Sequence, residues 1–324
     1  MMPFQIRAFE GRDTANLLSC WAKALPLDAI TLDDLENKVL LDANFEHGSL
    51  SIAHTDNRVA GFIVTFVLNK PIEKVGFRED TGYISAFGVD PEFRRQGIGA
   101  ALLGHAEQFF RARSRKLVVL APYTPNYFVP GVDKDHYPEG ISFLQNRGFT
   151  EYSEALAADA LISKFELKTE VLEKQNSLAA EGIQIRHYRR TDLLSFMQFL
   201  RAHMPGPWVE DARRNLLELA AGRFPEDAIW VAIDTSAQDG KEKIIGFCQH
   251  EHEHFGPFGV SDEYQGKGIG SVLLARTLYQ MRIRGCHSAW VLWTGERALK
   301  GVYGRLGFTL TRRFAVMKKE LAAS

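Results

Sequence analysis

The two halves of the chain repeat one another, and this repeat restricts the possible folds more than any other feature of the sequence. Ile6–Phe9, followed by Asp13, returns as Ile185–Tyr188, followed by Asp192. Three further landmarks return in the same order, and the pairs are Val59–Phe62 and Ile244–Phe247, Gly97–Gly99 and Gly268–Gly270, and Arg147–Phe149 and Leu306–Phe308. The loops between the landmarks differ in length, whereas the order of the landmarks does not. A repeat of this kind predicts two copies of one domain.

The domain boundaries follow from the positions of these landmarks. A length of 324 residues fits two domains of ordinary size. We expect an N-terminal domain over residues 1–168, a polar linker over residues 169–182 and a C-terminal domain over residues 183–324. The first half has a longer Pro-, Gly- and Asp-rich stretch, Tyr123–Gly140, before its last landmark, which predicts a long loop. Its residues Tyr123, Tyr127, Asp133 and Tyr137 are expected either to line a cleft or to cover the edge of the sheet or the other domain.

Each half shows the same order of predicted strands and helices. A strand leads into a helix, a hairpin follows, and a further strand runs directly into a glycine-rich loop and a helix. After a buried strand, the last helix of each half ends at a glycine, Gly148 or Gly307, suited to a left-handed cap. The predicted strands are Gln5–Ala8, Leu50–His54, Val59–Val67, Tyr83–Val89 and Leu117–Leu120, and then Ile183–His187, Ala228–Ile233, Ile244–Gln249, Phe255–Val260 and Ala289–Trp293; the predicted helices are Thr14–Ala24, Ala100–Arg113, Asp192–Ala202 and Ser271–Arg284. Each half is therefore α/β (α+β), with a mixed sheet flanked by helices.

Composition excludes several classes of protein. Lys and Arg total 39 against 40 Asp and Glu, so the sequence lacks the basic excess typical of nucleic-acid-binding proteins. Its longest apolar run, Val59–Leu68, is about half of the roughly 20 residues that cross a membrane. The first residues show no secretory signal, and three widely spaced cysteines, Cys20, Cys248 and Cys286, fit neither a disulfide framework nor a zinc site. We therefore expect a cytoplasmic protein that binds neither nucleic acid nor membranes.

A glycine-rich loop lies between a strand and a helix in both halves. Its residues are Arg94, Arg95, Gln96, Gly97, Ile98, Gly99 and Ala100 in the first half, and Gln265, Gly266, Lys267, Gly268, Ile269, Gly270 and Ser271 in the second. Because the glycines carry no side chain, several backbone N–H groups at the start of the helix point at one spot. Together with the positive end of the helix dipole, these groups form a phosphate site. The arginines and the lysine add positive charge there.

Three other interpretations compete with a phosphate site of this kind. A dinucleotide-binding fingerprint requires a third glycine where Leu102 and Leu273 stand. A P-loop requires Ser or Thr directly after its lysine, whereas Gly268 follows Lys267. A plain helix start, with glycine for close packing, would explain one such loop but explains two loops in matched contexts poorly. The sequence therefore favours two phosphate sites.

The motif Arg/Gln-x-x-Gly-x-Gly/Ala between a strand and a helix, with a later helix that ends in Gly-Phe, resembles the signature of the GNAT N-acetyltransferase superfamily. Both halves match it, so the whole chain is similar to tandem GNAT proteins such as those of the mycothiol synthase group. The resemblance implies a mostly antiparallel sheet in each domain and acetyl-CoA as the acyl donor, with its pyrophosphate held by the loop. It also implies that the preceding strand separates from its neighbour, so that Val89 and Val260 border the thioester.

Acetyl transfer to an amine requires a proton donor for the departing thiolate, and a phenol, with an ordinary pKa of about 10, is suitable. The resemblance places this donor at Tyr303, in the helix that ends at Gly307. The first half has Leu144 there, which cannot donate a proton, so we expect the chemistry in the second half. A packing role for the tyrosine is the alternative, and Glu296 stands where family members often have asparagine.

The base that takes the proton from the amine is expected in Gln249–His254, at the tip of the second hairpin. Glu253 and His254 are the candidates, directly or through water, because they enter the strand that leads to the thioester. Solvated hairpin residues are the alternative. Three alternate histidines also fit a metal site, but a hairpin tip would break their alternation, and no metal is expected.

The sequence thus predicts an N-acetyltransferase that moves the acetyl group of acetyl-CoA to the amine of a small molecule, by direct attack in its C-terminal domain. The resemblance implies an acceptor site built by the early helices and their connecting loop, here His203–Trp208, with Trp208 and Glu210 as contacts, unless this stretch only joins two helices. The N-terminal domain is expected to bind CoA without turnover. The alternatives are a non-catalytic acyl-CoA-binding or regulatory protein, and an acyltransferase that uses another acyl-CoA donor. The acceptor, the oligomeric state and the occupancy of both glycine loops stay open.

Overall fold

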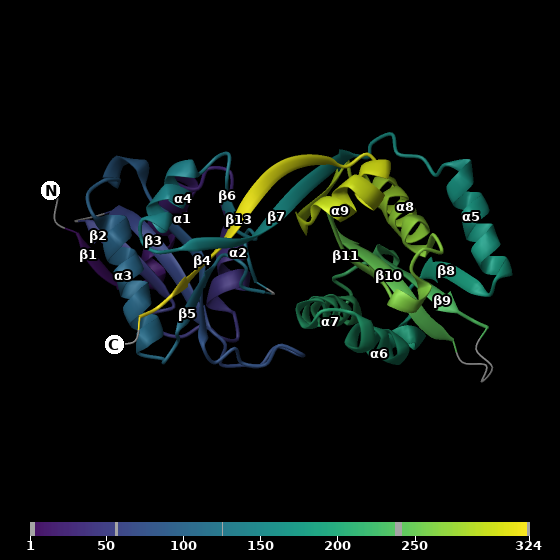
Figure 1. Cartoon of the computed structure of the whole chain (residues 1–324), viewed down its shortest axis with the longest axis horizontal. Helices are drawn as coiled ribbons and strands as arrows, with labels where there is room; N and C mark the ends of the chain where they lie inside the picture. Colours follow the sequence, from purple (N-terminus) through teal and green to yellow (C-terminus); the bar gives the residue numbers. More distant parts are fainter. Residues whose placement is uncertain (1–3, 56–57, 125, 237–241, 323–324) are drawn as a thin grey trace. The chain divides into compact units, whose positions relative to one another are not determined.

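The computed structural model describes residues 4–55, 58–124, 126–236 and 242–322, and it divides into two compact units (Figure 1). The N-terminal unit contains Met1–Ala155 together with Arg313–Ser324, and the C-terminal unit contains Leu156–Arg312. The chain therefore enters the C-terminal unit inside one strand and leaves it inside another. The predicted domains, 1–168 and 183–324 with a linker between them, divide the chain differently.

The N-terminal unit is a mixed sheet with helices on both faces. Its elements are β1 (Gln5–Ala8), η1 (Gly11–Asp13), α1 (Thr14–Ala24), α2 (Leu32–Leu35), η2 (Glu36–Leu40), β2 (Leu50–Thr55), β3 (Arg58–Val67), β4 (Thr81–Val89), η3 (Pro91–Phe93), α3 (Ile98–Arg111), β5 (Leu117–Leu120), β6 (Val132–Asp133) and α4 (Pro138–Gln145), with the start of β7 (Thr150–Leu161) and the end of β13 (Thr309–Glu320). The strand order is β1-β2-β3-β4-β5-β13. The pair β4–β5 is parallel, and the other neighbours with a described register are antiparallel.

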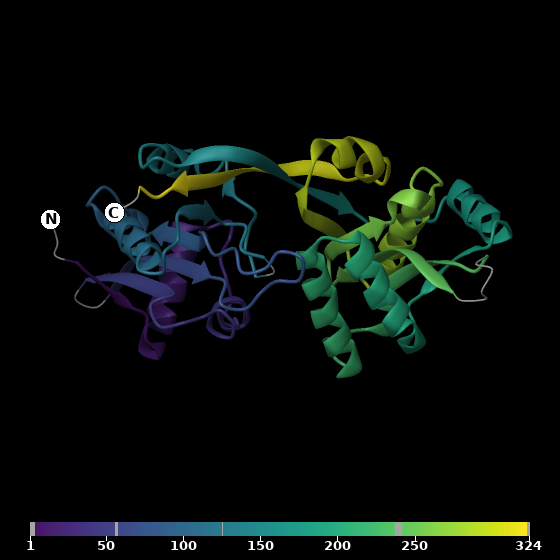
Figure 2. The ribbon, with the colours of Figure 1, turned by 60° about the horizontal axis from the view of Figure 1, so that its bottom comes forward.

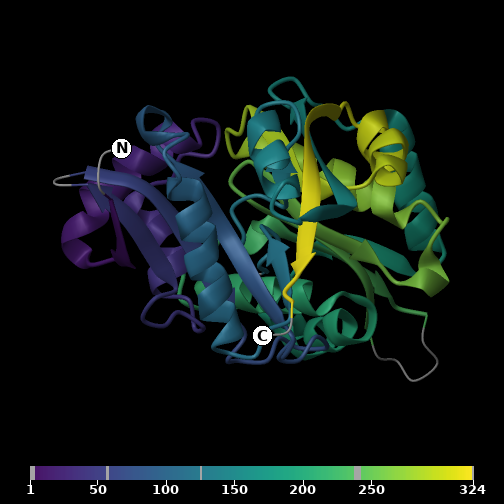
Figure 3. The ribbon, with the colours of Figure 1, turned by 60° about the vertical axis from the view of Figure 1, so that its left-hand side comes forward.

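The apolar side of one helix covers each face of this sheet, α1 on one face and α3 on the other. Leu17 and Trp21 of α1 pack with strand residues in one buried cluster. Leu102 and Ala106 of α3 pack with strand residues in another. In both helices these side chains are four residues apart, which places them on the same side of the helix. Figure 3 shows the sheet between α1, in purple, and α3, in blue.

The C-terminal unit repeats this arrangement. Its elements are α5 (Thr169–Ala180), β8 (Ile183–His187), η4 (Arg190–Asp192), α6 (Leu193–His203), α7 (Gly206–Ala220), η5 (Glu226–Ala228), β9 (Ile229–Asp234), β10 (Lys243–Glu251), β11 (His254–Val260), η6 (Asp262–Tyr264), α8 (Ile269–Ile283), β12 (Ser288–Thr294), α9 (Glu296–Ala298) and η7 (Leu299–Tyr303). The strand order is β7-β12-β11-β10-β9-β8, and β11–β12 is its parallel pair.

The two faces of the C-terminal sheet are covered by different helices. Phe196 of α6 and Val209 of α7 belong to one buried cluster, together with Ile229 and Phe247 of the sheet. Figure 2 shows α6 and α7 side by side. Helix α8 packs on the other face in a second cluster, and α5 packs against α8. We refer to these as the α6/α7 face and the α8 face.

The first repeated landmark has a structural basis in an ion pair. Arg7 donates to both carboxylate oxygens of Asp13, at 2.6 and 2.7 Å. Arg186 makes the same two contacts with Asp192, at 2.7 and 2.9 Å. Both aspartates are largely buried, so each pair fixes the start of the first helix to the first strand. The duplicated sequence thus corresponds to duplicated contacts.

The last strand of each half lies in the sheet of the other unit. Residues Leu156–Leu161 of β7 pair with β12, whereas Met317–Glu320 of β13 pair with β5. Buried Met317 belongs to the N-terminal core, and buried Ala160 belongs to the C-terminal core. Each core therefore depends on residues from the other half of the sequence.

The predicted strands and helices are confirmed, with ends that agree within two residues. Gly148 and Gly307 have the predicted left-handed conformation, with φ of 86° and 90°. Most of the predicted linker forms α5, whose Leu178 is buried in the C-terminal core, and Arg276 of α8 donates to Gln175 at 2.7 Å. The described residues include no helix that is both long and apolar enough to cross a membrane.

Candidate functional site

The glycine loops have the same backbone conformation in both halves. Gly97 and Gly268, which precede α3 and α8, have φ of 88° and 85°. Two residues earlier, Arg95 and Gly266 have φ of 61° and 79°. Left-handed residues of this kind turn neighbouring N–H groups towards one point, and the first N–H groups of a helix have no intrahelical partners. Each loop therefore presents several backbone donors at the positive end of a helix, a geometry suited to an anion.

The side chains of the loops differ between the halves. Arg94 donates to the carbonyl oxygens of Val89, at 3.1 Å, and Ala24, at 3.3 Å, so its guanidinium braces the end of β4. Arg95 is exposed, with Glu139 at 3.8 Å. Gln96 is only partly buried. The first loop thus has one arginine fixed to the backbone and one near a carboxylate.

In the second loop the residue at the position of Arg94 is Gln265, which donates to Asp262 at 2.7 Å. The ammonium of Lys267 lies 5.1 Å from the ring centre of Tyr264. Ser271, in the first turn of α8, is exposed, whereas Ile269 is buried and anchors the helix, as Ile98 does in α3. Lys267 is therefore an exposed cation within the loop.

The strand before each loop separates from its parallel neighbour. In the first half, Thr81–Ile84 of β4 pair with β5, and the remainder of β4 has no strand partner on that side among the residues that the structure describes. In the second half β11 pairs with β12 at one position, His254 with Trp290. The residue after β11 donates back to β10, from Ser261 N to Ile245 O at 2.9 Å. Since alternate N–H groups of a strand point in opposite directions, the N–H of Val260 points into the opening.

Different side chains lie beside the opening between β11 and β12 on the two faces of the C-terminal sheet. On the α6/α7 face, Met204 at the end of α6 occupies the space that a side chain at Gly259 would fill. On the α8 face, the Phe258 ring lies beside Gly270, 3.0 Å from where a Cβ atom would stand. The predicted acceptor turn, His203–Trp208, therefore lies against the unpaired strand.

Tyr303 lies on the α8 face of this unit. Its ring centre is 6.1 Å from that of Phe255 and 5.3 Å from that of Phe308. No hydrogen bond joins its hydroxyl to any residue that the structure describes. Burial raises the pKa of the phenol, and the nearby Cys248 thiol acts in the same direction, so the group stays protonated at neutral pH. The corresponding Leu144 of the first half is buried in the N-terminal core.

The two candidate bases have different surroundings. Glu253 lies in the β10–β11 turn and accepts hydrogen bonds from the backbone N–H groups of His287, at 3.2 Å, and Ser288, at 3.1 Å. Hydrogen bonding by Ser288 lowers the pKa of this carboxylate. His254 instead stacks on Trp290, with ring centres 4.3 Å apart, at the point where β11 and β12 separate. Glu253 is thus held by backbone N–H groups of the next segment, whereas His254 lies where the two strands separate.

The alternate histidines do not share a face. His250 is opposite Phe255 in the hairpin, on the α8 face, and it is almost fully buried with Nδ1 3.1 Å from the carbonyl oxygen of His252. His254 is opposite Glu251, on the α6/α7 face. Burial lowers the pKa of His250. Within the part of the chain that the structure describes, no group of three His, Cys, Asp or Glu side chains could hold a metal ion.

Two polar residues on the α6/α7 face were missed by the sequence analysis. Gln249 is fully buried on β10, and its side-chain nitrogen and oxygen both lack a hydrogen-bond partner among the described residues. Asp211 on α7 pairs with Arg214. Burial raises the pKa of Asp211, and the Glu251 carboxylate also raises it. In the sequence, the only indication of this buried polar group was the amide of Gln249 directly after an apolar strand. Of the predicted contacts, Trp208 is partly exposed, and Glu210 pairs with Arg213 at 2.6 Å.

The corresponding face of the N-terminal unit is closed. Tyr123, in the long loop after β5, is buried and stacks on Phe66, with ring centres 4.2 Å apart. Its hydroxyl donates to Asp42 at 2.8 Å and accepts from Asn44 at 3.0 Å. Of the two expectations for the loop tyrosines, Tyr123 therefore covers the sheet.

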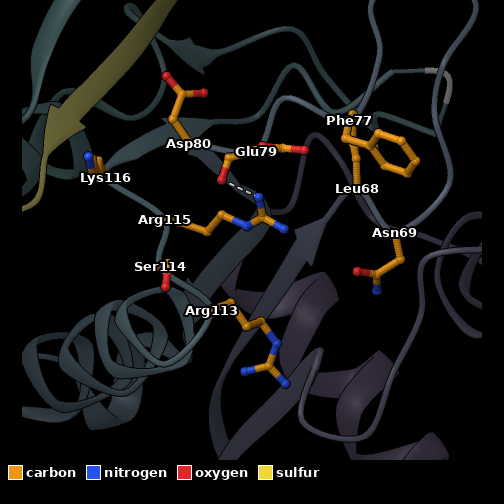
Figure 4. A pocket seen from close by; sticks show the side chains of 9 residues that line it. All are labelled: Leu68, Asn69, Phe77, Glu79, Asp80, Arg113, Ser114, Arg115 and Lys116. Carbon is orange, nitrogen blue, oxygen red and sulfur yellow. Dashed lines mark hydrogen bonds between the residues drawn. The ribbon is translucent and has the colours of Figure 1, made fainter.

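An open hollow of about 710 Å³ lies elsewhere in the N-terminal unit (Figure 4). Charged side chains line it, among them Glu79, Asp80, Arg113 and Arg115, and Arg115 donates to the carbonyl oxygen of Glu79. Asp80 directly precedes β4, whereas the glycine loop follows the other end of that strand. The hollow is therefore separate from the opening between β4 and β5.

Comparisons with known proteins agree with this geometry. A model described as the acetyltransferase (GNAT) family matches residues 18–127, and one described as an acetyltransferase (GNAT) domain matches residues 225–310. Together they cover more than half of the chain. Among curated proteins, none matches.

Several solved structures have a similar fold. One is a GCN5-related glucosamine N-acetyltransferase region of a fungal multi-domain GH3 β-N-acetylglucosaminidase. It is 17% identical to this chain, with a TM-score of 0.80 and 98% of this chain covered, and the chain spans 38% of that protein's length. A GCN5-related N-acetyltransferase from Sphaerobacter thermophilus is 18% identical, with a TM-score of 0.68, and 100% of this chain and 98% of that chain are covered. A tandem GNAT protein from the clavulanic acid biosynthesis pathway is 15% identical, with a TM-score of 0.65, and 99% and 100% are covered.

Proposed function

Because the chain belongs to the GNAT acetyltransferase family and carries two of its domains in tandem, we propose that it transfers the acetyl group of acetyl-CoA to the amine of a small molecule, with the chemistry in its C-terminal half. One observation carries this proposal. Tyr303 contacts Phe255 of β11 from the α8 face and has no hydrogen bond to a described residue, whereas the partly buried His254 stacks on Trp290 where β11 and β12 separate. The first half has Leu144 in place of the tyrosine.

The donor would bind along the unpaired strand and the glycine loop. Backbone N–H groups from Gly266 to Gly270 would hold the pyrophosphate, with Lys267 as an added cation. The N–H of Val260, which points into the opening, would donate to the carbonyl oxygen of the acetyl group as charge develops there. These contacts need no side chain other than that of Lys267, which is why glycine is suited to the loop.

The transfer would need two proton movements. The amine nitrogen forms a bond to the acetyl carbon, the carbon–sulfur bond breaks, and the electron pair of that bond leaves with sulfur. His254 would take the proton that the amine loses, directly or through water, and the ring of Trp290 holds its imidazole in place. Tyr303 would give a proton to the thiolate, which a phenol that stays protonated at neutral pH can do.

The N-terminal half would bind CoA without turnover. Its loop has the same left-handed residues as the second loop, at Arg95 and Gly97, and its strand β4 also separates from β5. It lacks the proton donor, and Tyr123 fills the face from which an acceptor would approach. We expect two molecules of acetyl-CoA per chain and one productive site.

Calorimetric titration with acetyl-CoA, combined with turnover, tests this division. Gly268→Asp places a carboxylate where phosphate would bind and should weaken one site by at least about tenfold, with loss of turnover. Gly268→Asn is the matched control, because Asn and Asp both tolerate the left-handed conformation and differ in charge. Gly97→Asp and Gly97→Asn repeat the comparison in the first half, where turnover should survive. Glucosamine is the first acceptor to assay, since one structure of similar fold is described as acting on it.

Two results would contradict the proposal. If no acetyl-CoA binds to the folded protein, the donor assignment is wrong. If Gly97→Asp abolishes turnover while Gly268→Asp retains it, the productive site lies in the N-terminal half.

A further inference from the structure

We propose that Gln249, together with Asp211 and Glu251, forms the acceptor pocket of the C-terminal half, and that this pocket takes an ammonium group with a neighbouring hydroxyl or carbonyl group. The inference rests on the proposed function and adds the class of acceptor to it. Its starting point is the buried amide of Gln249, whose nitrogen and oxygen both lack a partner among the described residues.

The direction of the Gln249 side chain follows from the strand register. Gln249 is opposite Ile229 of β9, and residues directly opposite one another in a sheet point to the same face. Ile229 belongs to the cluster under α6 and α7. Gln249 therefore points to the α6/α7 face, the face on which Met204 contacts the unpaired strand at Gly259.

The lack of a partner has a cost that a ligand would remove. A buried polar group without a hydrogen bond costs about 1–3 kcal/mol, and Gln249 has two such atoms, a donor and an acceptor. Native proteins rarely retain such groups without a reason. A hydroxyl or a carbonyl group on the acceptor would pair with the amide.

The charges beside this amide favour a cation. Glu251 is two residues after Gln249 on β10, so both point to the same face. Asp211 is on α7, which packs over this face of the sheet, and the Glu251 carboxylate acts to raise the pKa of Asp211. Arg214 pairs with Asp211, and no ion pair of Glu251 with a described residue is found. Asp211 thus has an arginine partner and Glu251 has none among the described residues, and the negative charge of Glu251 attracts an ammonium group.

The N-terminal half supports this assignment by contrast. The positions that correspond to Gln249 and Glu251, counted from Gly246 and Gly61, are Val64 and Phe66. Both are buried in an apolar cluster, and the ring of Tyr123 covers Phe66. The half without the proton donor therefore also lacks the polar pocket. The two features of an acceptor site occur together in one half and are missing together from the other.

A pair of small amines tests the class of acceptor. trans-2-Aminocyclohexanol and cyclohexylamine differ in one hydroxyl group, and both are used as acceptors in an assay of CoA thiol release. The wild-type protein should prefer the amino alcohol by about tenfold in kcat/KM, the worth of a good hydrogen bond. Gln249→Met keeps the length of the side chain and should remove this preference, so that kcat/KM is about equal for the two amines. The KM for acetyl-CoA should not change. Its melting temperature should stay the same or rise, because an unpaired amide is removed.

The charge is tested separately. Asp211→Asn should lower kcat/KM for both amines alike, whereas Glu218→Gln, also on α7 but paired with Arg223, should change neither. A preference that survives in Gln249→Met, or equal use of both amines by the wild-type protein, would overturn the inference. So would binding of acetyl-CoA without thiol release for any amino alcohol or amino sugar. If acetyl-CoA does not bind, the failure lies with the proposed function instead.

Discussion

Replacing Tyr303 with phenylalanine should separate catalysis from stability. The ring keeps its contacts with Phe255 and Phe308, and the lost hydroxyl has no described hydrogen-bond partner that would be left unpaired. The free energy of unfolding should therefore change by less than about 1 kcal/mol. Turnover should fall by about 10²–10⁴, the usual contribution of a positioned general acid, which corresponds to about 2.7–5.5 kcal/mol of activation free energy.

The assay is release of CoA thiol at saturating acetyl-CoA and amine, with a thermal melt of the same samples. The KM for acetyl-CoA should not change, since only an interaction of the transition state is lost. Burial raises the pKa of Tyr303, so the wild-type protein should retain turnover up to a pH above the ordinary phenol value of about 10. Tyr303→Phe should lose any alkaline decrease that comes from this group.

Tyr188→Phe is the matched control, because Tyr188 is buried in the cluster under α6 and α7 and has no proposed part in catalysis. Its turnover should equal that of the wild-type protein. Turnover of Tyr303→Phe within a factor of about three of the wild-type value would refute the reasoning, because such an effect is below 1 kcal/mol. A lower melting temperature with unchanged turnover would instead identify Tyr303 as a packing residue.

Three further changes test the base, the core and the repeated ion pair. His254→Gln should lower turnover by about 10²-fold, measured by thiol release. Unchanged turnover would exclude this base. Met317→Ala removes a fully buried side chain and should lower the free energy of unfolding, measured in urea, by about 2–5 kcal/mol. Hydrogen exchange in β5 should also become faster. Faster exchange in the C-terminal unit alone would contradict the assignment of β13 to the N-terminal core. Hydrogen bonding by Arg7 lowers the pKa of Asp13 in the folded protein. The pair therefore stabilises the fold at pH values above the pKa of an Asp in the unfolded chain, about 3.9, and this stabilisation is lost as the pH falls through the lower pKa of the folded state. Asp13→Asn should therefore cost about 2 kcal/mol at pH 7 and progressively less below pH 4, and a cost independent of pH would contradict this.

The local features of the fold could be predicted from the sequence because they have local causes. The repeat of Ile6–Phe9 at Ile185–Tyr188 corresponds to two equivalent ion pairs. Glycine at Gly97 and Gly268 marks two residues with left-handed backbone, and the helices begin directly after them. These features depend on residues a few positions apart, and one sequence is sufficient to reveal them.

The partners of the strands could not be predicted in the same way. The alternation of side chains in a strand indicates which face is buried but not which strand lies beside it. Nothing in Thr309–Glu320 itself distinguishes pairing with β5 from pairing with β12. The face of Gln249 was also hidden, because an irregularity in the β9–β10 register between Ile244 and Gly246 shifts the alternation of β10. Only the structure shows that this amide lies on the α6/α7 face.

The strand exchange gives a physical reason why neither half of the chain can fold in this way without the other. Strand β7 comes from the first half of the sequence, and its residues Ala158 and Ala160 are buried in the C-terminal core. Without this strand, β12 would have an unpaired edge, and the apolar surface next to it would be exposed to water. Leu144 and Tyr123, which distinguish the N-terminal half from the C-terminal half, are not part of β7. The strands that complete the two cores and the groups proposed for chemistry are thus on separate elements, which allows the halves to differ in function while each completes the fold of the other.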